Sequence, residues 1–74
     1  MNDEIGLDKS RRDARVNLTC VAEAIAYTMS LDRALRVVVE EWSGTRQNHA
    51  RINHPNGEFV DLYIDQIRRL YERL

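Results

Sequence analysis

Apolar residues recur at helical spacing along most of the chain. In the first segment they follow one another at steps of four, three, four and four, at Ala14, Leu18, Val21, Ile25 and Met29. This spacing places them on one stripe of an α-helix. Val16, Cys20 and Tyr27 form a second apolar strip on roughly the opposite side. The pattern predicts a helix over residues 11–29 with two buried sides.

The start of that segment also fits a strand. Arg15, Asn17 and Thr19 alternate with Val16 and Leu18, and a period of two is typical of a half-buried β-strand. A strand over residues 14–19 is therefore the alternative to the first part of the helix.

A second apolar stripe follows, and it is rotated by roughly 100° from the first if the helix continues straight. Its members are Leu31, Ala34, Leu35, Val38 and Trp42. A break at Ser30 removes the mismatch, because serine is a good N-cap and Asp32 would then lie in the first turn. Gly44 follows where a helix end is expected. We predict a second helix over residues 31–43, with a bent continuous helix as the alternative.

The third stripe runs to the end of the chain. Its apolar positions are Val60, Tyr63, Ile64, Ile67, Leu70, Tyr71 and Leu74, and charged residues fill the opposite face. This amphipathic pattern predicts a third helix over residues 58–74.

Between the second and third stripes lies the polar segment GTRQNHARINHPNG, residues 44–57. Helix–helix connections usually have about 2–8 residues, so this one is long. We expect a polar loop that ends in a turn at Pro55, Asn56 and Gly57. The alternative is a short strand at residues 50–53, which could continue through that turn into a hairpin within residues 50–62.

Together these segments predict an all-α fold. Residues 10–74 would form a single three-helix domain, and residues 1–9 a flexible tail. The alternative fold is α+β, with a short strand or hairpin near residues 50–62.

The chain has 74 residues, and a domain of this size builds only a thin core. Cys20 is the one cysteine, so an internal disulfide cannot add stability and a reducing compartment is indicated. A second subunit is a common remedy for a thin core. We therefore expect a homodimer.

The charge balance and the termini narrow the choice of partner. The formal net charge is −1, from 11 basic and 12 acidic residues, which disfavours a general polyanion binder. The N-terminus lacks the basic and apolar regions of a signal peptide, and no apolar run reaches the roughly 18 residues of a membrane span. We expect a soluble cytoplasmic protein with no membrane partner.

No residue pattern indicates catalysis. His49 and His54 are five positions apart, whereas zinc ligands on a helix are three or four apart and need further ligands. We interpret both as exposed loop histidines. The serines fit caps or turns, and Cys20 lies on an apolar strip. We expect no enzyme activity, cofactor, metal or small-molecule substrate.

Five arginines could contact nucleic acid: Arg11, Arg12, Arg15, Arg46 and Arg51. In addition, the segment IAYTMSLDRALRVVVEEW resembles a helix-turn-helix motif, with Ile25, Ala26, Met29, Leu31 and Val39 at its apolar positions. Ser30 replaces the usual turn glycine, and Arg36 occupies a normally buried aliphatic position.

The alternating Arg15, Asn17 and Thr19 also resemble the reading strand of ribbon-helix-helix repressors, which are dimers that bind the major groove. Only twelve residues separate Leu18 from the helix expected at Leu31, too few for that family's first helix and turn. We assign no family.

Three large side chains lie off the main apolar stripes: Tyr27, Phe59 and Leu62. If exposed, they are candidate anchors for a partner protein, because aromatic residues concentrate binding energy at interfaces. We predict a small intracellular regulatory or interaction protein that binds another macromolecule through a helix face. The alternative is a dimeric DNA-binding regulator that uses the N-terminal arginines.

Overall fold

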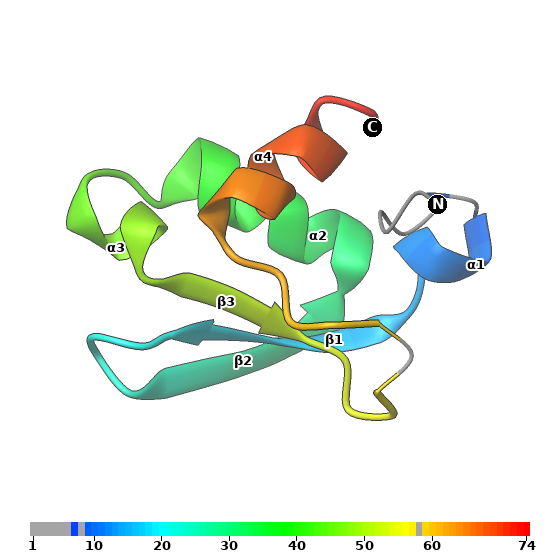
Figure 1. Cartoon of the computed structure of the whole chain (residues 1–74), viewed down its shortest axis with the longest axis horizontal. Helices are drawn as coiled ribbons and strands as arrows, with labels where there is room; N and C mark the ends of the chain where they lie inside the picture. The colour runs from blue at the N-terminus through cyan, green and yellow to red at the C-terminus, as the bar shows by residue number, and fades with distance from the viewer. Residues whose placement is uncertain (1–6, 8, 58) are drawn as a thin grey trace.

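The computed structural model describes Leu7, residues 9–57 and residues 59–74. These residues form a three-stranded antiparallel sheet with helices packed on one of its faces (Figure 1). The elements follow the order α1 (Lys9–Arg12), β1 (Arg15–Cys20), β2 (Ile25–Ser30), α2 (Leu31–Arg36), η1 (Val37–Glu41), α3 (Thr45–Asn48), β3 (Ala50–Asn53) and α4 (Ile64–Tyr71). The all-α prediction was therefore wrong, and the α+β alternative fits.

The strand order is β2-β1-β3, so β1 is the central strand. In the pairing with β2, Val16 lies opposite Met29, Leu18 opposite Tyr27 and Cys20 opposite Ile25. In the pairing with β3, Leu18 lies opposite Ile52 and Cys20 opposite Ala50. One face of the sheet is therefore apolar across all three strands.

The predicted helix over residues 11–29 is a hairpin instead, and the strand alternative for residues 14–19 was the better prediction. The two apolar strips expected on opposite sides of a helix merge on one face of the hairpin, because alternate residues of each strand point the same way. Val16, Leu18 and Cys20 are all buried there. A step of four also matches the period of two within one strand, as at Ile25 and Met29 of β2, which is why the helical period misled. Val21, at the step of three, lies in the turn and is exposed.

The connection between β1 and β2 has no glycine, proline or asparagine. It consists of Val21, Ala22, Glu23 and Ala24, and the Glu23 N–H donates to the Cys20 carbonyl at 3.1 Å. Ala24 has a φ of 55°, a left-handed conformation that costs an L-residue about 1–2 kcal/mol. The usual hairpin signal is therefore missing from the sequence, and the turn is held by the pairing of the strands around it.

The second predicted helix is present, and its start is confirmed. Ser30 is the N-cap of α2, and its hydroxyl accepts a hydrogen bond from the Arg33 N–H at 3.2 Å. From Val37 the helix continues as the π-helical turn η1, which ends with the Trp42 N–H bonded to the Val37 carbonyl at 2.9 Å. The predicted cap at Gly44 was wrong, because the helix ends at the C-cap Trp42. Gly44, with a φ of 62°, is instead the N-cap of α3.

The segment of residues 44–57 is not a loop throughout. It contains α3 and β3, so the expected polar loop was wrong and the short-strand alternative was right. Ile52 forms a β-bridge with Leu62, which is a minimal form of the hairpin considered within residues 50–62. Ala50 and Ile52 are buried, and their alternation with Arg51 and Asn53 explains why this short, mostly polar segment forms a strand.

The third predicted helix is shorter than expected. It covers Ile64–Tyr71 rather than residues 58–74, because the chain before it is extended alongside β3. Gln66 helps to begin the helix, since its side chain accepts a hydrogen bond from the Tyr63 N–H at 3.1 Å. Ile67 and Leu70 are the buried residues of α4.

The core lies between the sheet and the helices. Strand β1 contributes Val16, Leu18 and Cys20, and the remaining buried apolar residues are Leu31, Ala34, Leu35, Val37, Val38, Trp42, Ala50, Ile52, Leu62, Ile67 and Leu70. The whole second stripe of the sequence is therefore buried. Of the predicted tail, only Leu7 and Lys9 are described: Leu7 packs against the core and Lys9 begins α1.

The hairpin turn gives a test of this fold. Ala24→Gly should stabilise the protein by about 0.5–1 kcal/mol, because relief of the left-handed strain exceeds the added entropy of the unfolded chain. Thermal or urea unfolding measures the change. Ala22→Gly is the matched control, since only Ala24 has a positive φ among the described residues other than glycine, and it should not stabilise. A helix at this position would make both substitutions destabilising.

Candidate functional site

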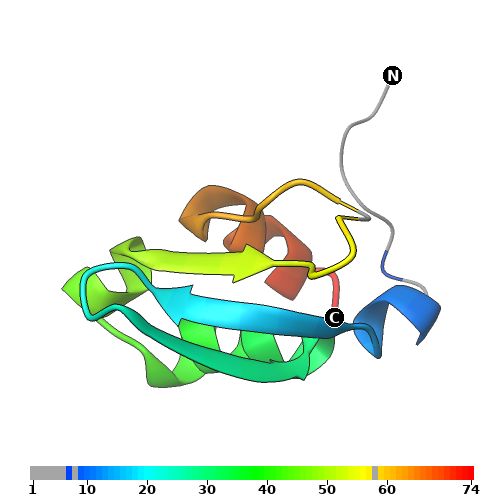
Figure 2. The ribbon, with the colours of Figure 1, turned by 90° about the horizontal axis from the view of Figure 1, so that it is seen from below.

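The two outer edges of the sheet differ. The chain itself covers the edge of β3, where Ile52 and Leu62 exchange backbone hydrogen bonds of 2.9 and 2.8 Å. At the other edge, no described residue outside β1 pairs with β2. We call this outer side of β2, Ile25–Ser30, the open edge; Figure 2 shows it bordering the sheet.

The ladder alternation determines which backbone groups lie at the open edge. Leu31 N–H donates to the Ala14 carbonyl at 2.9 Å, one pair beyond the end of the β1–β2 ladder. Since bonded and non-bonded pairs alternate in an antiparallel ladder, Ile25, Tyr27 and Met29 direct their backbone groups toward β1. Ala26 and Thr28 direct theirs outward. The open edge therefore offers N–H and carbonyl groups to a further strand.

Strand β2 lacks the features that usually protect an edge. Its sequence IAYTMS contains no charge, proline or glycine, whereas exposed edges are commonly blocked by lysine, proline or a bulge. Its apolar side chains on the helix-facing side are also incompletely covered, because Ile25 is 43% exposed and Tyr27 is 44% exposed. The edge is therefore both chemically suited to pairing and partly apolar.

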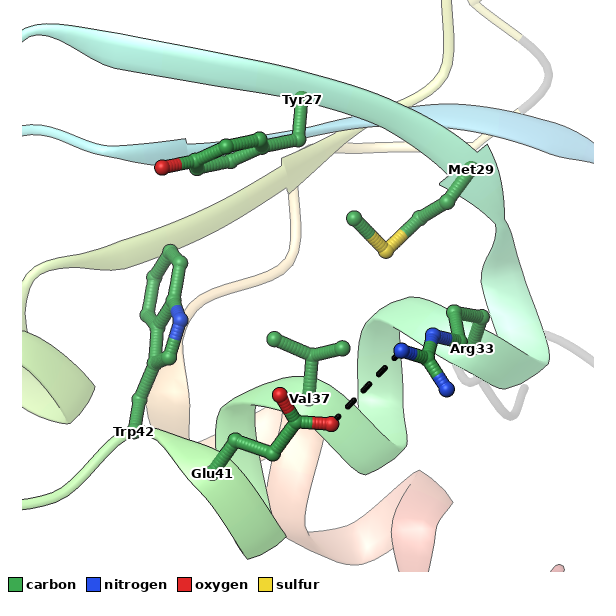
Figure 3. A pocket seen from close by; sticks show the side chains of 6 residues that line it. All are labelled: Tyr27, Met29, Arg33, Val37, Glu41 and Trp42. Carbon is green, nitrogen blue, oxygen red and sulfur yellow. Dashed lines mark ion pairs between the residues drawn. The ribbon is translucent and has the colours of Figure 1, made fainter.

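A groove runs between β2 and the helical segment beneath it. It has a volume of about 270 Å³ and is lined by Tyr27, Met29, Arg33, Val37, Glu41 and Trp42. Figure 3 shows Tyr27 and Met29 reaching from the strand toward the helix, with Val37 on the floor between them and Trp42 at one end. Pockets for drug-sized ligands hold about 300–1,000 Å³, so this groove is better matched to one or two side chains.

Charged groups of opposite sign mark the rim of the groove. Arg33 and Glu41 approach across Val37 with an N–O distance of 3.8 Å (Figure 3). Both side chains are mostly exposed, and an ion pair of this kind contributes about 0–1 kcal/mol. Charged groups of a partner can therefore replace this ion pair at little cost in free energy.

Trp42 is held in place at the end of the groove. The Arg46 guanidinium lies over its ring at 5.4 Å from the centroid, and Arg46 also bonds both carboxylate oxygens of Glu23 at 2.8 Å. Glu23 belongs to the β1–β2 turn. Arg46 therefore links α3, the hairpin turn and Trp42, and its charge is already matched by a carboxylate.

The opposite face of the sheet is polar, and no described helix covers it (Figure 2). A side-chain ladder crosses all three strands: Thr28 donates to Asn17 at 3.3 Å, Asn17 to Asn53 at 3.2 Å, and Asn53 to Asp61 at 3.3 Å. We call this surface the outer face; its strand residues are Arg15, Asn17, Thr19, Ala26, Thr28, Ser30, Arg51 and Asn53.

The structure separates the five candidate arginines. Arg15 and Arg51 share the outer face, where the Arg51 Nε is buried and has no hydrogen-bond partner within the described part of the chain. Arg11 and Arg12 belong to α1, away from that face. Arg12 donates to Asp32 at 2.8 and 3.2 Å. With Arg46 bound to Glu23, only Arg15 and Arg51 share one face, and they lie near opposite ends of β1.

The three candidate anchors also separate. Tyr27 lies at the groove and is exposed. Phe59 is half-buried and contacts the His54 ring edge-to-face, with the centroids 5.1 Å apart. Leu62 is 4% exposed and belongs to the core. Tyr27 is therefore the anchor available to a partner. The sequence offered no signal for its groove, because every other lining residue except Met29 comes from the helical segment after β2.

The two histidines have different environments. His49 is exposed, and its Nδ1 lies 2.8 Å from the Thr45 carbonyl oxygen. His54 is buried, so its interpretation as an exposed loop residue was wrong. Its Nδ1 accepts a hydrogen bond from the Asn56 N–H at 3.1 Å, which closes the turn after β3.

Two kinds of site are absent from the described residues. None of their histidine, cysteine and acidic side chains cluster in threes as a metal centre would need. Among the described helices, none has the length and apolar character needed to cross a membrane.

In comparisons with protein families, with curated proteins and with solved structures, nothing matches this chain.

Asp32 gives a pH-dependent test of how α1 is attached. Hydrogen bonds from Arg36 and Arg12 lower the pKa of its carboxyl group below the ordinary value. A lowered pKa in the folded state stabilises the protein above the unfolded pKa of about 3.9, and this stability is lost as the pH falls through the folded value.

We expect Asp32→Asn to lower the free energy of unfolding at pH 7 and to flatten its pH dependence below about pH 4. Urea unfolding between neutral and acidic pH measures both effects. Asp65→Asn is the matched control, since Asp65 lies in the first turn of α4 as Asp32 does in α2. Equal effects of the two substitutions would mean that the arginine bonds of Asp32 contribute nothing.

Proposed function

We propose that this protein is an interaction protein that binds a strand of another polypeptide chain at the open edge of β2. The observation that carries the proposal is the contrast between the two sheet edges: the chain covers the edge of β3 with its own Leu62 and leaves the uncharged β2 unprotected. Proteins generally block such edges. An edge left open in this way favours strand addition, a common mode of peptide recognition.

Two further features support a polypeptide as the partner. Strand addition takes its affinity from main-chain hydrogen bonds, and the outward groups of Ala26 and Thr28 supply donors and acceptors for them. Its specificity comes from pockets for alternate side chains. The groove beside β2 offers room for such side chains, with Tyr27 and Trp42 as aromatic contacts and Arg33 and Glu41 as polar ones.

We further propose that the protein acts in the cytoplasm. Its lone Cys20 is a buried free thiol, and thiols of this kind suit a reducing compartment.

The function is tested by site-specific photo-crosslinking in the native host. Tyr27 is replaced by the photoreactive residue benzoylphenylalanine, and Tyr63 by the same residue as a matched control. Tyr63 is similarly exposed, at 51% against 44% for Tyr27, but lies at the start of α4. We expect a covalent adduct with a polypeptide from position 27, several-fold stronger than from position 63.

A second substitution tests the role of the backbone. Thr28→Pro removes an outward N–H, leaves the ladder to β1 intact and is compatible with an extended residue 27. In the protein that carries the photoprobe at position 27, Thr28→Pro should abolish the adduct. The circular dichroism spectrum should stay unchanged, which shows that the protein remains folded. Equal adducts at positions 27 and 63, or an adduct that survives Thr28→Pro in a folded protein, would contradict strand addition.

Nucleic-acid binding is the second candidate, and one observation favours it. Arg15 and Arg51 lie near opposite ends of β1 on an uncovered sheet face, with hydrogen-bonding side chains between them. Such a face could contact phosphates and bases. Only two arginines are available there and the net charge is −1, so the affinity would depend on few phosphate contacts.

Fluorescence anisotropy with a short labelled DNA duplex at about 50 mM salt tests this candidate. Binding through the outer face predicts that Arg15→Ala with Arg51→Ala lowers the salt slope by about 0.9 for each phosphate that the variant no longer neutralises. Arg69→Ala, on the exposed side of α4, is the control for loss of a positive charge away from the outer face and should change little. Absence of duplex binding by the unaltered protein would remove this candidate.

A further inference from the structure

We propose that the strand added at the open edge is β2 of a second copy of this chain, paired antiparallel about a two-fold axis at Tyr27. This inference rests on the proposed strand-addition function and names its partner. The resulting dimer would carry one continuous six-strand sheet, with the helices of both copies on the same side.

The sequence of β2 is complementary to itself in this register. An axis at Tyr27 places Tyr27 opposite its own copy, Ile25 opposite Met29, and Ala26 opposite Thr28. The last pair consists of the residues that direct their backbone groups outward, so the ladder hydrogen bonds can form. The first two pairs bring together apolar side chains on the helix-facing side, where Ile25 and Tyr27 are each more than 40% exposed in a single chain. Cross-strand apolar and aromatic pairs stabilise antiparallel strand pairing.

The charges at the rim of the groove are complementary under the same symmetry. After β2 the chain reverses, so α2 and η1 run back beneath the strand (Figure 3). In Figure 3 Arg33 and Glu41 lie on either side of Val37, and Trp42 lies beyond Glu41 at the end of the groove. A two-fold axis at Tyr27 turns the helical segment of the second copy end for end. Arg33 of each copy then faces Glu41 of the other, and Val37 faces Val37.

The composition of the open edge favours a copy over an unrelated strand of high charge. Strand β2 has no charged residue, so two copies meet without repulsion between like charges. The groove of each copy is closed by the apolar strand and helix of the other. A small domain with a thin core also gains from this burial, because the area left exposed on β2 becomes part of a shared core.

Sedimentation equilibrium of the full chain tests the partner. We expect a dimer at micromolar concentration. Tyr27→Lys should raise the dimer dissociation constant by more than about tenfold, because two like charges would lie directly opposite each other in the paired strands. Val60→Lys is the matched control: Val60 is 70% exposed and lies beside the covered edge of β3. The Val60→Lys protein should keep the dimer dissociation constant of the unaltered protein. Circular dichroism checks that both variants are folded.

Disulfide trapping tests the register without depending on the lysine variant. A non-hydrogen-bonded antiparallel pair has a Cα–Cα distance of about 4.5 Å, within the range of about 4.4–6.8 Å that a disulfide spans. Tyr27→Cys should therefore give a covalent dimer under mild oxidation. Thr28→Cys and Val60→Cys should not, and the native Cys20 is buried.

The outcomes separate this inference from the function on which it rests. A folded monomer at about 100 μM, a dimer that tolerates Tyr27→Lys, or trapping at Thr28 in place of Tyr27 would overturn pairing with a second copy. If the position-27 photoprobe then captures a different polypeptide, strand addition stands and only its partner changes. Capture within the same chain, on residues 1–6, would overturn both proposals.

Discussion

Pairing of β1 on both of its edges is the constraint on which the rest of the structure depends. Its inner side chains, Val16, Leu18 and Cys20, are almost fully buried, and they contact the helical layer only because β2 and β3 hold the strand flat on either side. The same pairing holds the four-residue turn with its left-handed Ala24. Without the flanking strands, neither the hairpin nor the short β3 would persist, because isolated two-strand ribbons are marginally stable in water.

A three-strand sheet must have two edges, and this chain treats them unequally. The residues before α4 extend along β3 and close one edge through Leu62. Strand β2 ends at Ser30, which is also the N-cap of α2, so the chain turns under the sheet instead of along it. The open edge and the groove thus arise from one local event, the start of a helix at the end of an edge strand. An edge-paired dimer would also double the outer face and bring four arginines onto one surface, so the two candidate functions are physically compatible.

Tertiary contacts decide which charged residues remain available. Arg12 and Arg46 were equal to Arg15 as candidates in the sequence, but each is bonded to a carboxylate more than fifteen residues away, Asp32 and Glu23 respectively. Arg46 also covers Trp42. These contacts convert two candidate binding residues into structural ones. The distant carboxylates carry no pattern that would have revealed the pairs in advance.

The sequence by itself determined the features that depend on near neighbours. The Ser30 cap, the buried stripe from Leu31 to Trp42 and the buried side of α4 follow from spacings of three to four within one helix. The strand at Ala50–Asn53 and the hairpin of β1 and β2 were decided by the tertiary structure. The hairpin turn of Val21 to Ala24 contains no usual turn residue, and apolar positions of the hairpin fit both a helical period and a strand period. Tyr27 was recognised as a candidate anchor, whereas its groove was not. The groove exists only where β2 and the helix after it fold back on each other, and no local period encodes that contact.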